Sequence, residues 1–107
     1  LLFVSGQTAL DAEGNLVGIG DAAAQTLQVF DNIGHVLAAA GTSFAHVLEF
    51  TTYLVGRQHI QPYLAARAEL FPSLFPNADY PANTLLVVDS LGREEALVEI
   101  KAIATLP

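Results

Sequence analysis

The 107-residue sequence contains no cysteine, no methionine and no tryptophan. The absence of cysteine excludes a disulfide framework, a thiolate metal site and a cysteine nucleophile. Because the chain opens on Leu1 and has no methionine, we expect that an upstream segment is missing from it. No signal peptide is recognisable, and no apolar run approaches the ~18 residues of a membrane span.

Positive charge is also scarce, since four Lys and Arg face eleven Asp and Glu and give a formal net charge of −7. A nucleic acid or an anionic membrane surface would need a basic patch. We therefore expect neither as a partner. A chain without cysteine is compatible with a reducing compartment, and we expect a cytoplasmic protein.

Apolar residues, in contrast, make up 52% of the chain. A chain of this length supports one domain, whose small core needs less apolar surface than this. The excess predicts a second buried surface, most simply an interface between subunits.

The pattern in the first half of the chain predicts a strand, a helix and a second strand. The helix is expected over residues 21–40, with Asp21 as its N-cap and Gly41 just after its end. Gly34 inside this helix predicts close packing at that point. We expect strands over residues 1–7 and 47–55, and a short returning strand over residues 16–19.

The second half predicts another helix over residues 59–71, ended by Pro72, and then two strands over residues 81–90 and 96–106. The short connection containing Gly92 predicts that these two strands form a hairpin. The predicted fold class is therefore α+β, with helices on one face of a mainly antiparallel sheet. Both faces of the last two strands are partly apolar, so we expect another subunit to cover the face without helices.

Short motifs occur in order along almost the whole chain: FVSGQ at residues 3–7, AQ at 24–25, LAAAG at 37–41, TTYL at 51–54, FP at 71–72, PA at 81–82 and ALVEIKAIA at 96–104. This order resembles the RidA family, also called the YjgF or endoribonuclease L-PSP family. The resemblance implies a single chorismate-mutase-like domain over residues 1–107 that lacks the family's N-terminal strand. It also implies a homotrimer with clefts between subunits that bind a small metabolite, without a cofactor.

Relatives in this family hydrolyse the reactive imines and enamines that PLP-dependent dehydratases form, releasing 2-oxo acids and ammonia. The resemblance implies that an arginine in a Pro-Ala-Arg motif holds the substrate carboxylate, and that a glutamate on the last strand positions water. The glutamate is retained as Glu99, but Asn83 stands where the arginine is expected. Asparagine carries no charge. We therefore expect weak deamination of 2-imino acids, a substrate unlike them, and membership of a branch of the family that lacks the arginine.

The candidate catalytic residue is Glu99, and the candidate substrate-binding residues are Asn83, Leu85, Lys101, Ser5 and Gly6. The predicted hairpin would place Asn83 and Glu99 on adjoining strands, where they could share a face. Each candidate also has a structural alternative. Glu99 could pair with Lys101, and Lys101 could supply the lost cation or form an ion pair at a subunit interface.

Ser5 and Gly6 resemble a turn at the edge of the family's cleft, in which the backbone contacts the ligand, but they could equally form a purely structural turn. Leu85 would line the cleft or pack in an interface. Arg67 lies in mid-helix, where exposure to solvent or an ion pair with Asp or Glu is expected. The three histidines are spaced 11 and 13 residues apart and suggest no metal site.

The leading hypothesis is a homotrimer that binds a small metabolite between subunits and hydrolyses an imine or enamine with Glu99. The alternative is a trimer of the same shape that binds small molecules, or acts like a chaperone, without catalysis. A ribonuclease, which one family name suggests, conflicts with the acidic charge.

Overall fold

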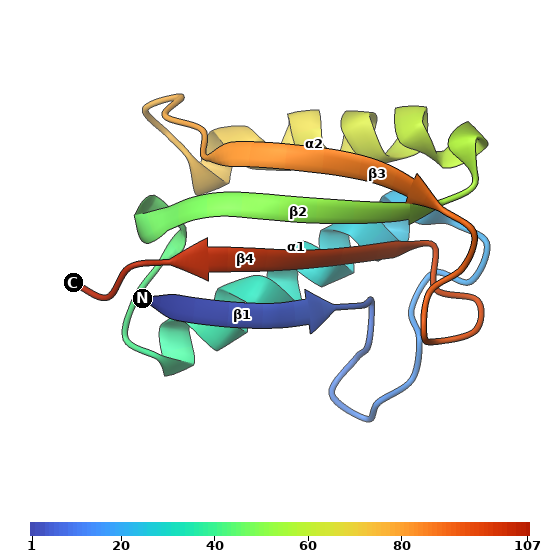
Figure 1. Ribbon diagram of the computed structural model, residues 1–107, viewed down its shortest axis with the longest axis horizontal. Helices are drawn as coiled ribbons and strands as arrows, with labels where there is room; N and C mark the ends of the chain where they lie inside the picture. The colour runs from blue at the N-terminus through green and yellow to red at the C-terminus, as the bar shows by residue number, and fades with distance from the viewer.

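Four strands form one sheet in the order β1-β4-β2-β3, and both helices pack behind it in the view of Figure 1. The computed structural model describes all 107 residues. The elements are β1 (Leu2–Gln7), α1 (Ala22–Ala39), β2 (Val47–Val55), α2 (Ile60–Leu74), β3 (Ala82–Val88) and β4 (Val98–Ala104). Strand β4 is antiparallel to β1 and β2. The predicted α+β class with helices on one face is confirmed, and neither helix is both long and apolar enough to cross a membrane.

The predicted hairpin between the last two strands is wrong. Strand β3 pairs in parallel with β2 at one edge of the sheet, and β4 lies between β1 and β2. Helix α2 connects β2 to β3, and such a crossover returns the chain in the same direction. Every second residue of β4 is buried, namely Val98, Ile100, Ala102 and Ala104. This fully apolar row packs against the helices, as expected, while the strand pairs with β1 and β2 and not with β3.

Two further boundaries differ from the prediction. Residues 16–19 form no strand, because only an isolated bridge joins Leu10 and Leu16. Helix α2 continues through Pro72 to Leu74. A proline leaves the carbonyl four residues earlier without its helical partner. That carbonyl belongs to the exposed Ala68, where water can reach it.

Helix α1 begins and ends as its sequence predicts. The Asp21 carboxylate accepts a hydrogen bond of 3.0 Å from the backbone N–H of Ala24. Gly41 has φ +81°, in the left-handed region that favours glycine after a helix. A Cβ on Gly34 would lie 3.1 Å from the Phe44 ring, which confirms the close packing expected there.

Five phenylalanines interlock between the helices and β2. Their ring centroids lie 5.0 to 6.5 Å apart, and the five are Phe30, Phe44, Phe50, Phe71 and Phe75. Tyr80 stacks on Phe71 at 5.8 Å. Each such pair contributes about 0.5–1.5 kcal/mol beyond burial. The cluster therefore anchors α2 to the sheet and holds the segment that leads into β3.

Buried and half-buried amides fix the two loops that flank the sheet. The buried Gln25 side chain donates to the carbonyl oxygens of Gly18 and Glu95 at 3.1 and 3.2 Å, and accepts from the Leu97 N–H at 2.8 Å. One side chain of α1 thus joins the loop after β1 to the loop before β4.

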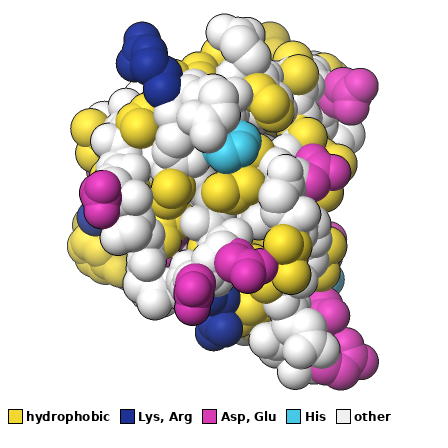
Figure 2. Space-filling model, turned by 90° about the vertical axis from the view of Figure 1, so that its right-hand side faces the viewer, with side chains coloured by type: hydrophobic (Ala, Val, Ile, Leu, Met, Phe, Trp, Pro, Cys, Tyr) yellow, Lys and Arg dark blue, Asp and Glu magenta, His cyan; other side chains and the backbone are white.

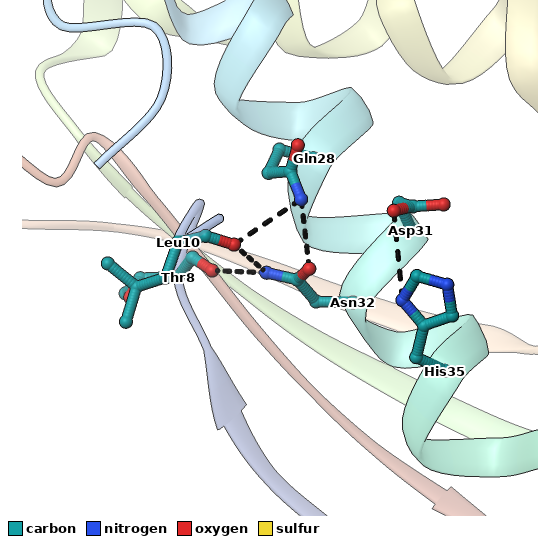
Figure 3. Close-up of polar contacts among 6 residues, drawn as sticks. All are labelled: Thr8, Leu10, Gln28, Asp31, Asn32 and His35. Atoms are coloured by element: carbon teal, nitrogen blue, oxygen red, sulfur yellow. Dashed lines mark hydrogen bonds and ion pairs between the residues drawn. The ribbon is translucent and has the colours of Figure 1, made fainter. Parts of the chain in front are cut away.

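A second amide pair holds the chain directly after β1 (Figure 3). Asn32 Nδ2 donates to the carbonyl oxygens of Thr8 and Leu10 at 3.1 and 2.9 Å. Gln28 Nε2 donates to the Leu10 carbonyl at 3.3 Å and to Asn32 Oδ1 at 2.9 Å. These bonds fix the path of the chain where it leaves the Ser5–Gly6 segment.

Candidate functional site

Glu99 lies on the central strand β4, on the sheet face that carries no helix. Its neighbours Val98 and Ile100 are buried on the other face, and Glu99 itself is half-buried. The Glu99 side chain extends over Gly6 of β1. A Cβ built on Gly6 would overlap Glu99 Oε2 and lie 2.8 Å from Cδ. Glycine at residue 6 therefore makes the room that this carboxylate occupies.

Ser5 is exposed beside Gly6, and its carbonyl accepts a hydrogen bond of 3.0 Å from Gln7 Nε2. The structure thus brings Ser5, Gly6 and Glu99 together on neighbouring strands. The expected turn at Ser5 and Gly6 is wrong, because both residues lie within β1, where its pairing with β4 is irregular between Val4 and Gln7. Lys101 lies on the same face and is exposed. The only ion pair within 4 Å joins Asp31 and His35, at 3.8 Å. The expected pairing of Glu99 with Lys101 is therefore absent within one chain.

Asn83 lies on the opposite face of the sheet from Glu99. In the register of the sheet, Asn83 is the partner of the buried Phe50, whereas Glu99 is the partner of Tyr53. The expectation that Asn83 and Glu99 share a face on adjoining strands is wrong, because β2 separates them and the register turns their side chains apart. Leu85 shares the helix-covered face with Asn83 and packs against the core. Leu86 is the β3 residue in line with Glu99.

A groove with a volume of about 420 Å³ lies between α2 and the start of β3, on the helix-covered side. Its lining from α2 is Leu64, Arg67, Ala68, Phe71 and Pro72, and from the following segment Tyr80, Pro81 and Asn83. Asn83 thus lines this groove, and Glu99 of the same chain does not.

A chain of hydrogen bonds runs beneath this groove. Thr52 donates to Asn83 Oδ1 at 2.9 Å, and the Thr52 and Tyr63 hydroxyls are 3.2 Å apart. Arg67 Nη1 donates to the Tyr63 hydroxyl at 3.3 Å. The buried Thr52 and Tyr63 therefore connect Asn83 on β3 with Arg67 on α2.

Arg67 differs from its expected environment of open solvent or an ion pair. Its guanidinium carbon lies 5.4 Å from the ring centroids of both Tyr63 and Phe71. The spacing of four residues between Tyr63, Arg67 and Phe71 puts all three on one helix face. This spacing could have indicated from the sequence that Arg67 lies between two aromatic rings. The family resemblance gave no such indication, because it concerns the arginine expected at residue 83.

The surface outside these features is acidic. Figure 2, which views the right-hand end of Figure 1, shows Asp and Glu side chains at several separate places among apolar atoms. The histidines are dispersed, with His35 on α1 and His46 and His59 in short 3-10 turns. No three side chains of His, Asp or Glu gather to form a metal site.

Comparison with known proteins gives consistent matches over nearly the whole chain. The profile of the family described as Endoribonuclease L-PSP matches residues 1–106. A RutC family protein of Synechocystis is 34% identical over 99% of this chain and 78% of its own. The 3-aminoacrylate deaminase RutC of Acinetobacter baylyi is 34% identical over 97% of this chain and 78% of its own.

Solved structures agree with these sequence matches. The Rid family protein YyfB of Yersinia pestis superposes with a TM-score of 0.85 at 40% identity, covering 98% of this chain and 77% of its own. The YjgF protein of E. coli gives a TM-score of 0.83 at 27% identity, covering 95% and 77%. The family profile, the sequence relatives and the solved structures together establish that the chain belongs to the endoribonuclease L-PSP family, that is, the RidA/YjgF family.

Proposed function

We propose that this chain forms a homotrimer in the cytoplasm and hydrolyses a small imine or enamine in clefts between its subunits. In each cleft, one copy supplies Glu99 with Ser5 and Gly6 of β1, and the next copy supplies the groove that contains Asn83. Lys101 would then face the neighbouring copy across the interface.

The observation that carries this proposal is the placement of Glu99 and Asn83 on opposite faces of one sheet. No single copy can direct both side chains at one ligand. Two copies can do so if the open face of one sheet meets the groove edge of the next. This arrangement agrees with the inter-subunit clefts that the family resemblance implies.

The open face of the sheet also favours a covering neighbour. Phe3 is 69% exposed on β1 and Leu86 is 45% exposed on β3, at the two edges of this face. Tyr53 and Ile103 lie between them and are half-buried. An apolar face of this kind is costly to leave in water and is typical of a subunit interface.

The half-buried Glu99 carboxylate suits the proposed hydrolysis. It would accept a proton from a water molecule as the water oxygen bonds to the imine carbon, and the C=N double bond becomes a single bond. The proton then passes to the nitrogen and gives a carbinolamine. The carboxylate next transfers the hydroxyl proton of the carbinolamine to the nitrogen, the C–N bond breaks, ammonia leaves, and the oxygen remains as a carbonyl. An enamine enters the same sequence after a proton adds to its carbon. The name of the Acinetobacter relative, a 3-aminoacrylate deaminase, supports this reaction class.

The test is to measure ammonia release from 3-aminoacrylate and 2-iminopropanoate, each generated in the assay, with the wild type and Glu99→Gln. We expect Glu99→Gln to lower the rate by about 100-fold or more, because the amide cannot take the proton. Glu49→Gln, the same substitution at an exposed glutamate on the same sheet face, is the matched control and should keep the wild-type rate. A wild type that forms trimers and binds metabolites but hydrolyses neither compound would support the non-catalytic alternative.

A further inference from the structure

The groove between α2 and β3 is lined by one positively charged side chain, Arg67. Arg67 lines this groove, although the resemblance places the family's arginine at residue 83. We propose that Arg67 binds the carboxylate of the ligand, together with the amide of Asn83. This inference rests on the proposed function, because it takes the ligand to be the metabolite that binds in the inter-subunit cleft.

Arg67 is held in place but keeps most of its hydrogen-bonding capacity. The Tyr63 and Phe71 rings flank the guanidinium at 5.4 Å, and such stacking restricts its orientation. Its only hydrogen bond within the chain is to the Tyr63 hydroxyl, and no carboxylate lies within 4 Å. A guanidinium has five N–H donors in a planar fork. The others are therefore available to a ligand.

The hydrogen bonds beneath the groove also orient Asn83. Thr52 donates to Asn83 Oδ1, so the Asn83 oxygen is occupied by the protein. The Nδ2 group of Asn83, which carries two N–H donors, makes no hydrogen bond within the chain. Arg67 and the Nδ2 group of Asn83 thus offer donors only, the Tyr80 hydroxyl can also donate, and no Asp or Glu lines the groove. In a chain with a net charge of −7, this is a site for an anion.

The shape and the remaining walls narrow the ligand class. A volume of about 420 Å³ accommodates a small organic molecule. Leu64, Phe71 and Pro72 form one apolar wall, and Tyr80 lies at the rim with 53% of its surface exposed. Carboxylate and phosphate oxygens both match a guanidinium fork, and the acids of the proposed reaction carry a carboxylate. The ligand is therefore a small carboxylic acid with a short apolar or planar remainder.

The test compares pyruvate with pyruvamide, which has nearly the same size but no charge. Binding is measured by calorimetric or NMR titration on the Glu99→Gln trimer, so that hydrolysis does not enter the result. We expect pyruvate to bind at least about tenfold more tightly than pyruvamide. Arg67→Met should abolish this preference, and Arg67→Lys should restore part of it because a lysine keeps the charge but not the fork. Arg93→Met, at an exposed arginine outside the groove, should retain the full preference.

Equal affinity for pyruvate and pyruvamide, or a preference that survives in Arg67→Met, would overturn the inference. If Arg67→Met fails to fold, Arg67→Lys decides alone, since an unchanged preference there would show that the fork is not used. The binding result is independent of catalysis. An inactive wild type that prefers pyruvate through Arg67 would refute the proposed hydrolysis and leave the carboxylate site intact.

Discussion

The carboxylate of Glu99 lies so close to Gly6 that a methyl group at residue 6 would overlap Oε2. Two strands that are far apart in the sequence, β1 and β4, thus meet at the proposed catalytic group. The backbone of Gly6 does not have a positive φ, so alanine is tolerated by the main chain. The contact with Glu99 is therefore the main reason for glycine at this position.

Gly6→Ala should move the Glu99 carboxylate and lower the rate of imine hydrolysis by about 10- to 100-fold, because small displacements of a catalytic group are costly. The melting temperature should change little, since the Glu99 side chain can move into solvent. Gly92→Ala is the matched control, because a Cβ there meets nothing within 4 Å. An unchanged rate in Gly6→Ala would show that the position of the carboxylate is unimportant.

Mixed trimers should regain activity from two inactive chains. If Glu99 and Arg67 in each cleft come from different copies, Glu99→Gln and Arg67→Met chains co-refolded in equal amounts restore about a quarter of the clefts. The measurement is ammonia release from the mixture relative to wild type. If both residues acted from the same copy, the mixture would remain as inactive as its components.

Leu86→Asp should dissociate the trimer, because it places a carboxylate within the apolar face that a neighbour is proposed to cover. Light scattering should then give a mass near 11.3 kDa instead of about three times that value. Leu27→Asp is the control, since Leu27 is 42% exposed but lies on α1, on the other side of the sheet. Equal masses for the Leu86→Asp variant and the wild type would exclude this face as the interface.

Gln25→Leu should lower the free energy of unfolding by about 2–4 kcal/mol. The change leaves the carbonyls of Gly18 and Glu95 and the N–H of Leu97 without their partner, the buried Gln25 amide. Urea denaturation measures the loss. Gln61→Leu, at an exposed position on α2, should be nearly neutral. A comparable loss in both variants would mean that the three hydrogen bonds contribute little.

Local signals predicted the elements well, and long-range pairing poorly. Helix α1 is specified by its own caps, Asp21 and Gly41, which need no distant partner. The pairing of β3 with β2 depends instead on where α2 packs. The short connection that contains Gly92 carries no information about this packing. The same limit applies to the site. The resemblance directed attention to Ser5, Gly6 and Glu99, which the structure brings together. The position of Arg67 depends instead on which face α2 turns toward β3.

Phe71 belongs both to the aromatic core and to the wall of the groove beneath Arg67. The binding surface is thus continuous with the interior and not carried on a separate loop. A substitution of Phe71 would disturb the packing of the other phenylalanines. Changes in ligand specificity are therefore expected at lining residues outside the aromatic core, such as Ala68 and Tyr80. Occupancy of the groove should also stabilise the core, and a bound acid would then raise the melting temperature by an amount that grows with the logarithm of its concentration over Kd.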